Sequence, residues 1–192
     1  MPAGSRPVPE VPLPRFREVM STFATGVVVV TAVDAGEPVG MTVQSFASLS
    51  LRPPLVVFAP ARTSRTWSRV RLAGSFCANV LAEDQAVVAA AMAGAGDRFA
   101  DVRWTPGVGG APRIDGALAH VEATVEAVHD GGDHDLVVGR VRQVAAPRDA
   151  APLLYHRSAW ARLVDDAQAA VRTVPADASE GSSAVTSMRG PS

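Results

Sequence analysis

Small hydroxyl side chains gather in one short stretch of the sequence, GMTVQSFASLSLRPPLVVF at residues 40–58. Thr42, Ser45, Ser48 and Ser50 stand where a strand built only for a core would carry Val or Ile. Short hydroxyls donate and accept hydrogen bonds, and they let the backbone approach a ligand closely. They are also typical of a turn whose hydroxyls bond their own backbone. The stretch therefore predicts either a ligand-lining segment or a polar turn.

A second stretch, ARTSRT at residues 61–66, precedes a segment with helical spacing. The N-terminus of a helix carries unpaired N–H groups and partial positive charge, and for this reason it binds phosphate well. Ser64 and Thr66 add hydroxyl donors, and three arginines between residues 62 and 69 add guanidinium groups suited to phosphate. The stretch fits a phosphate cradle or a plain helix cap with solvated arginines.

Two glycine-containing stretches complete the set of candidate sites. GGDHD at residues 131–135 places His134 in a hairpin turn, where it is either simply exposed or presented at the mouth of a site. GVGG at residues 107–110 neither follows a strand nor opens a helix, so the dinucleotide-binding interpretation fails. No His/Asp/Glu set has metal-ligand spacing, and no nucleophile elbow is present. A phosphate cradle and a hydroxyl-lined strand end, without an acid pair or triad, indicate chemistry carried by a bound phosphorylated cofactor.

Composition sets the broad class of the protein. The 192 residues are enough for one domain with a sizeable core, and an apolar fraction of 47% favours a globular chain. A net charge of −1 gives no bulk attraction to nucleic acid or to an anionic membrane. The single cysteine, Cys77, excludes an intramolecular disulfide and is expected to be a buried hydrophobe. No apolar run approaches the roughly 20 residues of a membrane span, so we expect a soluble cytoplasmic protein.

The positioning elements can be read from hydrophobic periodicity and breakers. Residues 1–14 are rich in proline and predict a loose arm, residues 15–164 a single domain, and residues 165–192 a disordered tail. We expect a helix with Phe16 and Phe23 on its apolar side, ended by Gly26, and two further helices at residues 62–74 and from Asp84 onward. Strands are predicted at residues 27–33, 39–44, 55–59 and 76–81, and one more within 152–164.

The centre of the chain predicts a loop followed by a hairpin. Residues 94–116 are punctuated by Gly and Pro and predict a loop. ALAHVEATVEAV then alternates, with Ala119, Val121, Ala123, Val125 and Ala127 on one face and His120, Glu122, Thr124 and Glu126 on the other. DGGDH turns the chain and LVVGRVRQV returns as the partner strand. Many short strands with two or three helices predict an antiparallel barrel decorated by helices.

Several motifs in this order resemble the flavin reductase domain family, the small reductase components of two-component flavin-dependent monooxygenases. They are FREVMSTFATGVVVVTA, GMTVQSFASLSLRPPLVVF, RTSRTW, FCANVLAEDQ, DRF, GDHDLVVGRV and PLLYHR, and they run from about residue 16 to 164. The resemblance implies a mainly β fold, a split, Greek-key-like antiparallel β-barrel with a few flanking helices. It also implies FMN or FAD as the flavin, NADH or NADPH as the reductant, a homodimer, and a partner monooxygenase that receives the reduced flavin.

The same resemblance implies roles for individual residues. The segment along the flavin ring and ribityl chain comprises Thr42, Val43, Gln44, Ser45, Ala47, Ser48, Leu49 and Ser50. Ser64, Arg65 and Thr66 are expected to bind the flavin phosphate. His134, with Gly132 and Asp133, is expected beside the nicotinamide, which Phe99 and Tyr155 would help to shape. The chain departs from the family at Gln44, where Ser or Asn is common, at Met92, where Phe is common, and at Ser158 and Trp160, where Gly and Tyr are frequent.

The implied reaction is hydride transfer from the nicotinamide to the flavin ring. The protein then needs no strong acid or base, but must hold the reacting atoms about 3–3.5 Å apart. His134 is assigned to binding or orienting the nicotinamide. Two alternatives stay open at this stage. One is a split-barrel protein that carries or senses flavin without turnover, and the other is an oxidase of a vitamin B6-type substrate, which GDH and TSRT fit less well.

Overall fold

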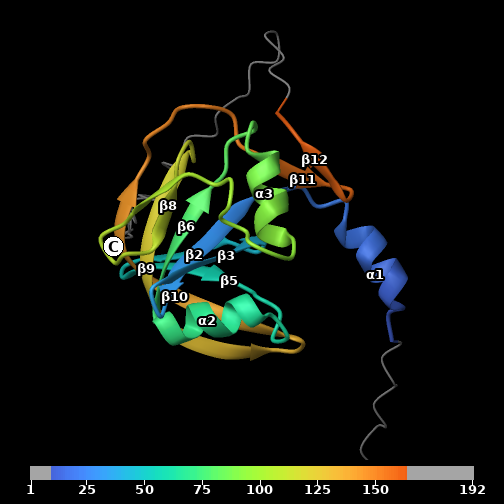
Figure 1. Ribbon diagram of the computed structural model, residues 1–192. Helices are drawn as coiled ribbons and strands as arrows, with labels where there is room; N and C mark the ends of the chain where they lie inside the picture. Colours follow the sequence, from blue (N-terminus) through green and yellow to red (C-terminus); the bar gives the residue numbers. More distant parts are fainter. Residues whose placement is uncertain (1–9, 164–192) are drawn as a thin grey trace, which may run out of the picture.

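The computed structural model describes residues 10–163, and a seven-stranded antiparallel sheet dominates it (Figure 1). The order of strands across this sheet is β3-β2-β6-β9-β10-β5-β4. Their bounds are β2 Val28–Asp34, β3 Glu37–Val43, β4 Ala47–Leu51, β5 Pro54–Phe58, β6 Ser75–Val80, β9 Ala119–Gly131 and β10 His134–Ala145. The predicted mainly β fold is therefore confirmed. The predicted arm and tail fall largely on residues 1–9 and 164–192, which lie outside the described residues.

Smaller elements flank the sheet. Two short sheets are β1 Thr25–Gly26 with β11 Leu154–His156 and β12 Ala159–Ala161, and β7 Trp104–Pro106 with β8 Pro112–Ile114. The three helices of the described region are α1 Leu13–Met20, α2 Arg65–Ala73 and α3 Ala86–Ala93. None of these helices has the length and apolar character needed to cross a lipid bilayer.

The seven strands curl strongly but do not close into a hydrogen-bonded barrel. Strands β3 and β4 are the two outer strands of the sheet, yet only residues 44–46 separate them in the chain. Since an extended residue spans at most about 3.6 Å, the ends of these two strands lie within about 14 Å of each other. No ladder joins β3 to β4 in the described residues. The strands thus form an open, curled sheet whose two edges approach at one end, and the expected split barrel is confirmed only in part.

The main core lies inside the curl and is completed by α2. Phe58 of β5 packs edge-on against Trp67 of α2 and Phe76 of β6, with ring centroids 5.9 and 5.2 Å away. All three side chains are almost fully buried. Gly139 lies at a register shift between β9 and β10, and a Cβ built there would stand 2.6 Å from the Phe76 ring. The glycine therefore makes room for the aromatic centre of the core.

On the outer face of the sheet, α3 lies against β3 and β2, and the segment 94–116, which was predicted as loop, lies against β2, β6 and β9. This segment contains the β7–β8 hairpin, and GVGG forms its turn, with Gly107 N–H bonded to Ala111 O at 2.9 Å. The hairpin covers polar groups on the face of β9 that the alternation had assigned to His120, Glu122, Thr124 and Glu126. Buried Glu122 accepts from Arg113, and buried His120 lies 3.0 Å from Ile114 O. The period-2 pattern gave the core face of β9 correctly as far as Val125, but it did not reveal the cover over the polar face.

Three features differ from the expectations, each for a local reason. Helix α1 ends at Met20, well before Gly26, because the hydroxyls of Ser21 and Thr22 donate to the final carbonyls of the helix. The core face of β9 continues at Val128 rather than Ala127, since a bulge interrupts the alternation. The expected single strand in 152–164 is a hairpin, β11–β12, turned at positive φ by Arg157 and Ser158.

Candidate functional site

A pocket of about 480 Å³ opens where four elements end or begin together. The end of β3, the residues after β5, the start of α2 and the first residue of β10 all reach it, and α3 closes one side. Its lining comprises Met41, Thr42, Val43, Gln44, Ser45, Ala59, Pro60, Ala61, Ser64, Met92, Ala93, Arg98 and His134. The approach of the two sheet edges therefore brings together three of the four predicted stretches: the hydroxyl cluster, the helix start and the histidine turn.

The hydroxyls in this pocket already have protein partners. Thr42 Oγ1 donates to Ala89 O of α3 at 2.7 Å. Ser45 Oγ accepts from Ala59 N–H at 2.8 Å and lies 3.3 Å from Ala59 O, so it joins the residues after β3 to those after β5. These bonds hold the pocket walls in place. In the described region Gln44 makes no side-chain hydrogen bond, and its exposed amide faces the pocket.

Helix α2 begins at the pocket, and capping residues in the sequence define both of its ends. Ser64 is the N-cap, and its Oγ accepts from Trp67 N–H at 3.2 Å. Gly74 ends the helix in the left-handed region at φ +70°, where glycine carries no steric penalty. The first turn of α2 thus points its free N–H groups toward the pocket side on which Ser64 lies.

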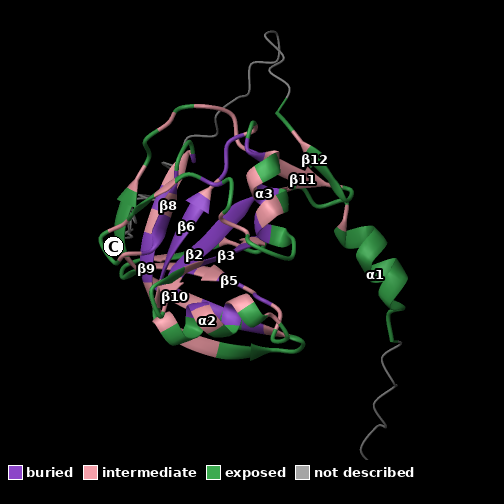
Figure 2. Ribbon diagram, viewed as in Figure 1, coloured by how far each residue is buried: buried purple, intermediate pink, exposed green. Residues whose placement is uncertain are grey.

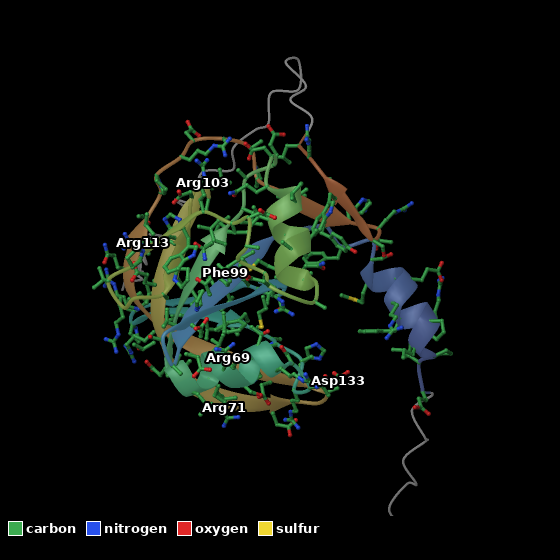
Figure 3. The ribbon with its side chains drawn as sticks, in the orientation of Figure 1. Arg69, Arg71, Phe99, Arg103, Arg113 and Asp133 are labelled. Atoms are coloured by element: carbon green, nitrogen blue, oxygen red, sulfur yellow. The ribbon has the colours of Figure 1, made fainter. Side chains whose placement is uncertain are left out.

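A second pocket, of about 620 Å³, adjoins the first and shares Arg98 with it. Arg65, Thr66, Arg69 and Phe99 line it, among others. Arg98 Nη1 donates to Gly40 O and to Thr66 Oγ1, both at 2.7 Å, and its Nε donates to Gly94 O at 2.8 Å. Figure 3 shows Arg69 and Phe99 between α2 and α3. Sequence reasoning chose Phe99 from the DRF motif and missed its neighbour Arg98.

His134 occupies the start of β10, where the β9–β10 hairpin meets the residues after β5. Its backbone pairs with Ala61 in an isolated β-bridge. Its Nδ1 lies 2.7 Å from Asp133 Oδ1, and this contact lowers the pKa of the Asp133 carboxyl below its ordinary value. Asp133 itself is on the exposed hairpin turn beside the start of α2 (Figure 3). Because one ring nitrogen is engaged by Asp133, the other is available to a ligand.

Some predicted site residues lie elsewhere. Ala47, Ser48, Leu49 and Ser50 belong to β4, which pairs with β5, and they do not line the pocket. Gly132 and Asp133 lie in the turn next to His134 but outside the lining. Tyr155 pairs with Thr25 across β1 and β11 and packs on Trp160 at a centroid distance of 5.0 Å. The structure brings these residues to neighbouring elements rather than to the pocket wall.

Comparison with known proteins gives a consistent result. The flavin reductase like domain matches residues 20–163. The chain belongs to this family. Among its relatives is the reductase subunit HsaB of a flavin-dependent monooxygenase from Rhodococcus jostii, 45% identical over 163 residues, which cover 84% of this chain and 81% of that protein.

Two solved structures of this family are similar throughout the described region. The nitrilotriacetate monooxygenase component B homolog from Mycobacterium thermoresistibile is 42% identical with a TM-score of 0.76, over 82% of this chain and 96% of that one. The NADH:FAD oxidoreductase SgcE6 from Streptomyces globisporus, in complex with NAD and FAD fragments, is 34% identical with a TM-score of 0.76, over 83% and 99%.

The residues present fit a flavin reductase. The first pocket offers apolar walls from Met41, Met92 and Pro60 for a flat ring, with the Gln44 amide at its edge. The adjoining pocket offers the guanidinium groups of Arg65 and Arg98, which suit an anionic phosphate. Arg65 has no carboxylate partner among the described residues. Apolar side chains in one pocket and an excess of arginines over the acids Glu37 and Asp97 in the adjoining one suit the two ends of FMN or FAD.

Proposed function

We propose that this protein is an NADH-dependent flavin reductase that supplies reduced flavin to a separate monooxygenase. The observation that carries the proposal is the joined pair of pockets, because apolar side chains line part of the first together with His134, and three arginines outnumber Glu37 and Asp97 in the second. Family membership and the relatives named as monooxygenase reductase subunits support the same activity. The residues of the two pockets would hold the flavin, and the bound flavin would supply the hydride-accepting chemistry.

The chain's own residues would bind and orient the two ring systems. Residues 41–45 and Met92 form the walls for the flavin ring, while Ser64, Arg65 and Thr66 at the start of α2 receive the phosphate. Arg98 lies between the two groups of residues and holds Thr66 in place. Fixing both partners in a slot converts a bimolecular encounter into a local one, which is the main contribution expected of this protein.

His134 would bind or orient the nicotinamide. Its ring reaches the pocket from the end of the hairpin, and the contact between Nδ1 and Asp133 leaves Nε2 for the ligand. We therefore expect His134→Ala to raise the Michaelis constant for NADH while the dissociation constant for flavin changes little. Unchanged kinetics would remove His134 from the site.

A homodimer is the proposed assembly. Helix α1 stands away from the sheet, and none of its residues is buried (Figures 1 and 2). Phe16 and Phe23 are 53% and 68% exposed, which is unusual for large aromatic side chains on one continuous segment. A second copy of the chain would cover this apolar surface. The cytoplasm is the proposed location, because the reductant NADH is held there.

One assay separates the enzyme from a flavin carrier. Purified protein is mixed with NADH and either FMN or FAD, and the loss of absorbance at 340 nm is followed against flavin alone. The reductase is expected to oxidise NADH well above that background and to distinguish the two flavins. Tight flavin binding without NADH oxidation would instead identify the non-catalytic carrier.

A further inference from the structure

One carboxylate behind the site joins two of the elements that build it. Asp135 follows His134 in β10, so its side chain points to the opposite face of the strand. There it accepts from Trp67 Nε1 at 2.8 Å and from Arg62 Nε at 2.9 Å, and Arg71 Nη1 lies 3.8 Å away. Its side chain is 12% exposed. Sequence reasoning gave this residue no role.

The partners of Asp135 lie in helix α2 or just before it, and with Asp135 they line a pocket of about 770 Å³ that shares no lining residue with the two pockets of the site. Trp67 is in the first turn of α2, is 2% exposed, and donates its backbone N–H to the N-cap Ser64. Arg62 precedes that helix, and its backbone N–H bonds Asp133 O at 3.1 Å. The backbone N–H of Asp135 bonds Pro60 O at 3.0 Å. The residues on either side of His134 are therefore each held by a backbone hydrogen bond. The Asp135 carboxylate adds a side-chain contact on the opposite face of the strand.

Besides these backbone bonds, the other side-chain contacts of the hairpin end are highly exposed. Asp133 is 94% exposed beside His134, and Asp130 is 78% exposed where it meets Arg62. Solvent-exposed ion pairs contribute little because water and salt screen them. Asp135 is instead almost buried and accepts two charge-assisted or indole hydrogen bonds, which lower the pKa of its carboxyl, the Trp67 bond most of all. The carboxylate is thus kept ionised and bonded.

We propose that Asp135 is a positioning residue: it ties the hairpin that carries His134 to helix α2 and so sets where the imidazole stands relative to the bound flavin. This inference rests on the proposed function, because it gives His134 a nicotinamide to meet. Asp135 lines neither of the two pockets of the site, although its backbone N–H bonds Pro60 of the first, and its carboxylate acts on the imidazole only through the hairpin that carries His134. Small displacements matter here, since a 1 Å misplacement can cost on the order of a hundredfold in rate.

The test is a double-mutant cycle on the Michaelis constant for NADH, measured at saturating FMN with the full chain. Asp135→Asn keeps the volume but turns an amide N–H₂ toward Arg62 or Trp67, and we expect it to raise the Michaelis constant roughly tenfold. In the His134→Ala background the same change should have no further effect, because there is no imidazole left to position. The dissociation constant of FMN, from fluorescence quenching, should stay within about twofold in every variant.

Two further variants keep the test decisive. Trp67→Phe removes only the indole N–H and should show the same dependence on His134, which covers the case in which Asp135→Asn does not fold. Asp34→Asn is the matched control, because Asp34 also accepts from an arginine of α2, Arg69 Nε at 2.6 Å, but contacts nothing in the hairpin. It should leave the Michaelis constant for NADH unchanged.

The outcomes separate this proposal from the proposed function. If Asp135→Asn raises the Michaelis constant equally with and without His134, the residue acts on the fold and the positioning role is wrong. The same conclusion follows if Asp135→Asn and Trp67→Phe leave the constant unchanged while His134→Ala raises it. If His134→Ala itself has no effect, the nicotinamide role of His134 fails, and the positioning role fails with it.

Discussion

Replacing Arg98 should weaken binding of the flavin phosphate much more than binding of the flavin ring. It lies between the two pockets, and its guanidinium donates to Gly40 O, Thr66 Oγ1 and Gly94 O. Arg98→Ala removes the positive charge and also releases Thr66, one of the residues expected at the phosphate. FMN carries that phosphate and riboflavin does not, so the pair of ligands isolates the effect.

The size of the effect follows from the kind of contact that is lost. A hydrogen bond to a charged group contributes about 1.5–3 kcal/mol, and every 1.4 kcal/mol is a tenfold change in affinity. Because Arg98 is only half-buried, screening by solvent reduces this contribution. We expect the dissociation constant of FMN to rise roughly 10- to 100-fold and that of riboflavin less than about threefold. Arg98→Lys should fall between, because an ammonium keeps the charge without the planar fork that meets several acceptors.

The assay is titration of flavin fluorescence at fixed ionic strength, with FMN and riboflavin in parallel. Arg148→Ala serves as control, since it removes an arginine that pairs with Asp84 at the other side of α3. Repeating the FMN titration in high salt should reduce the difference between wild type and Arg98→Ala, because screening weakens the phosphate contact. Equal losses for FMN and riboflavin would mean that Arg98 only supports the loop. FMN affinity unchanged in Arg98→Ala would refute the phosphate assignment of the second pocket.

Three further predictions concern the fold that holds the site. Gly139→Ala should lower the free energy of unfolding by about 1–3 kcal/mol, measured by urea denaturation, because the new Cβ meets the Phe76 ring at 2.6 Å. Cys77 should not react with iodoacetamide at pH 8 until the protein is unfolded, because burial, with the nearby Glu122 charge, raises the pKa of its thiol to about 12. Stability should fall as the pH drops through the acidic range, and less so in Asp135→Asn, since a carboxyl whose pKa is lowered in the folded state stabilises the protein only while ionised.

Local pattern was enough to predict the elements that carry the site. The N-cap Ser64 and the C-terminal Gly74 fixed α2 because both caps are local signals. The β9–β10 hairpin could be predicted for the same reason, because the five consecutive residues DGGDH form a local turn signal. What local pattern lacked was the pairing of distant segments. The β7–β8 hairpin is stabilised by contacts such as Arg113 with Glu122, and neither residue signals the other in the sequence.

The hydroxyl stretch shows the same division within a single motif. Thr42 and Ser45 line the pocket, whereas Ser48 and Ser50 lie in β4, where a register shift against β5 separates them. Spacing alone could not distinguish the two pairs, because the chain crosses from one sheet edge to the other between Val43 and Ala47. Only the curl of the whole sheet decides which hydroxyls face the pocket.

The pocket hydroxyls also explain why a segment that lines the pocket is rich in small polar groups. Thr42 bonds α3 and Ser45 bonds the residue after β5, so each hydroxyl joins two elements that no hydrogen-bond ladder connects. In an open sheet such bonds connect elements that strand pairing would connect in a closed barrel. Gln44 has no such bond in the described region, so its exposed side chain is the one of this segment that we expect to reach a bound ligand.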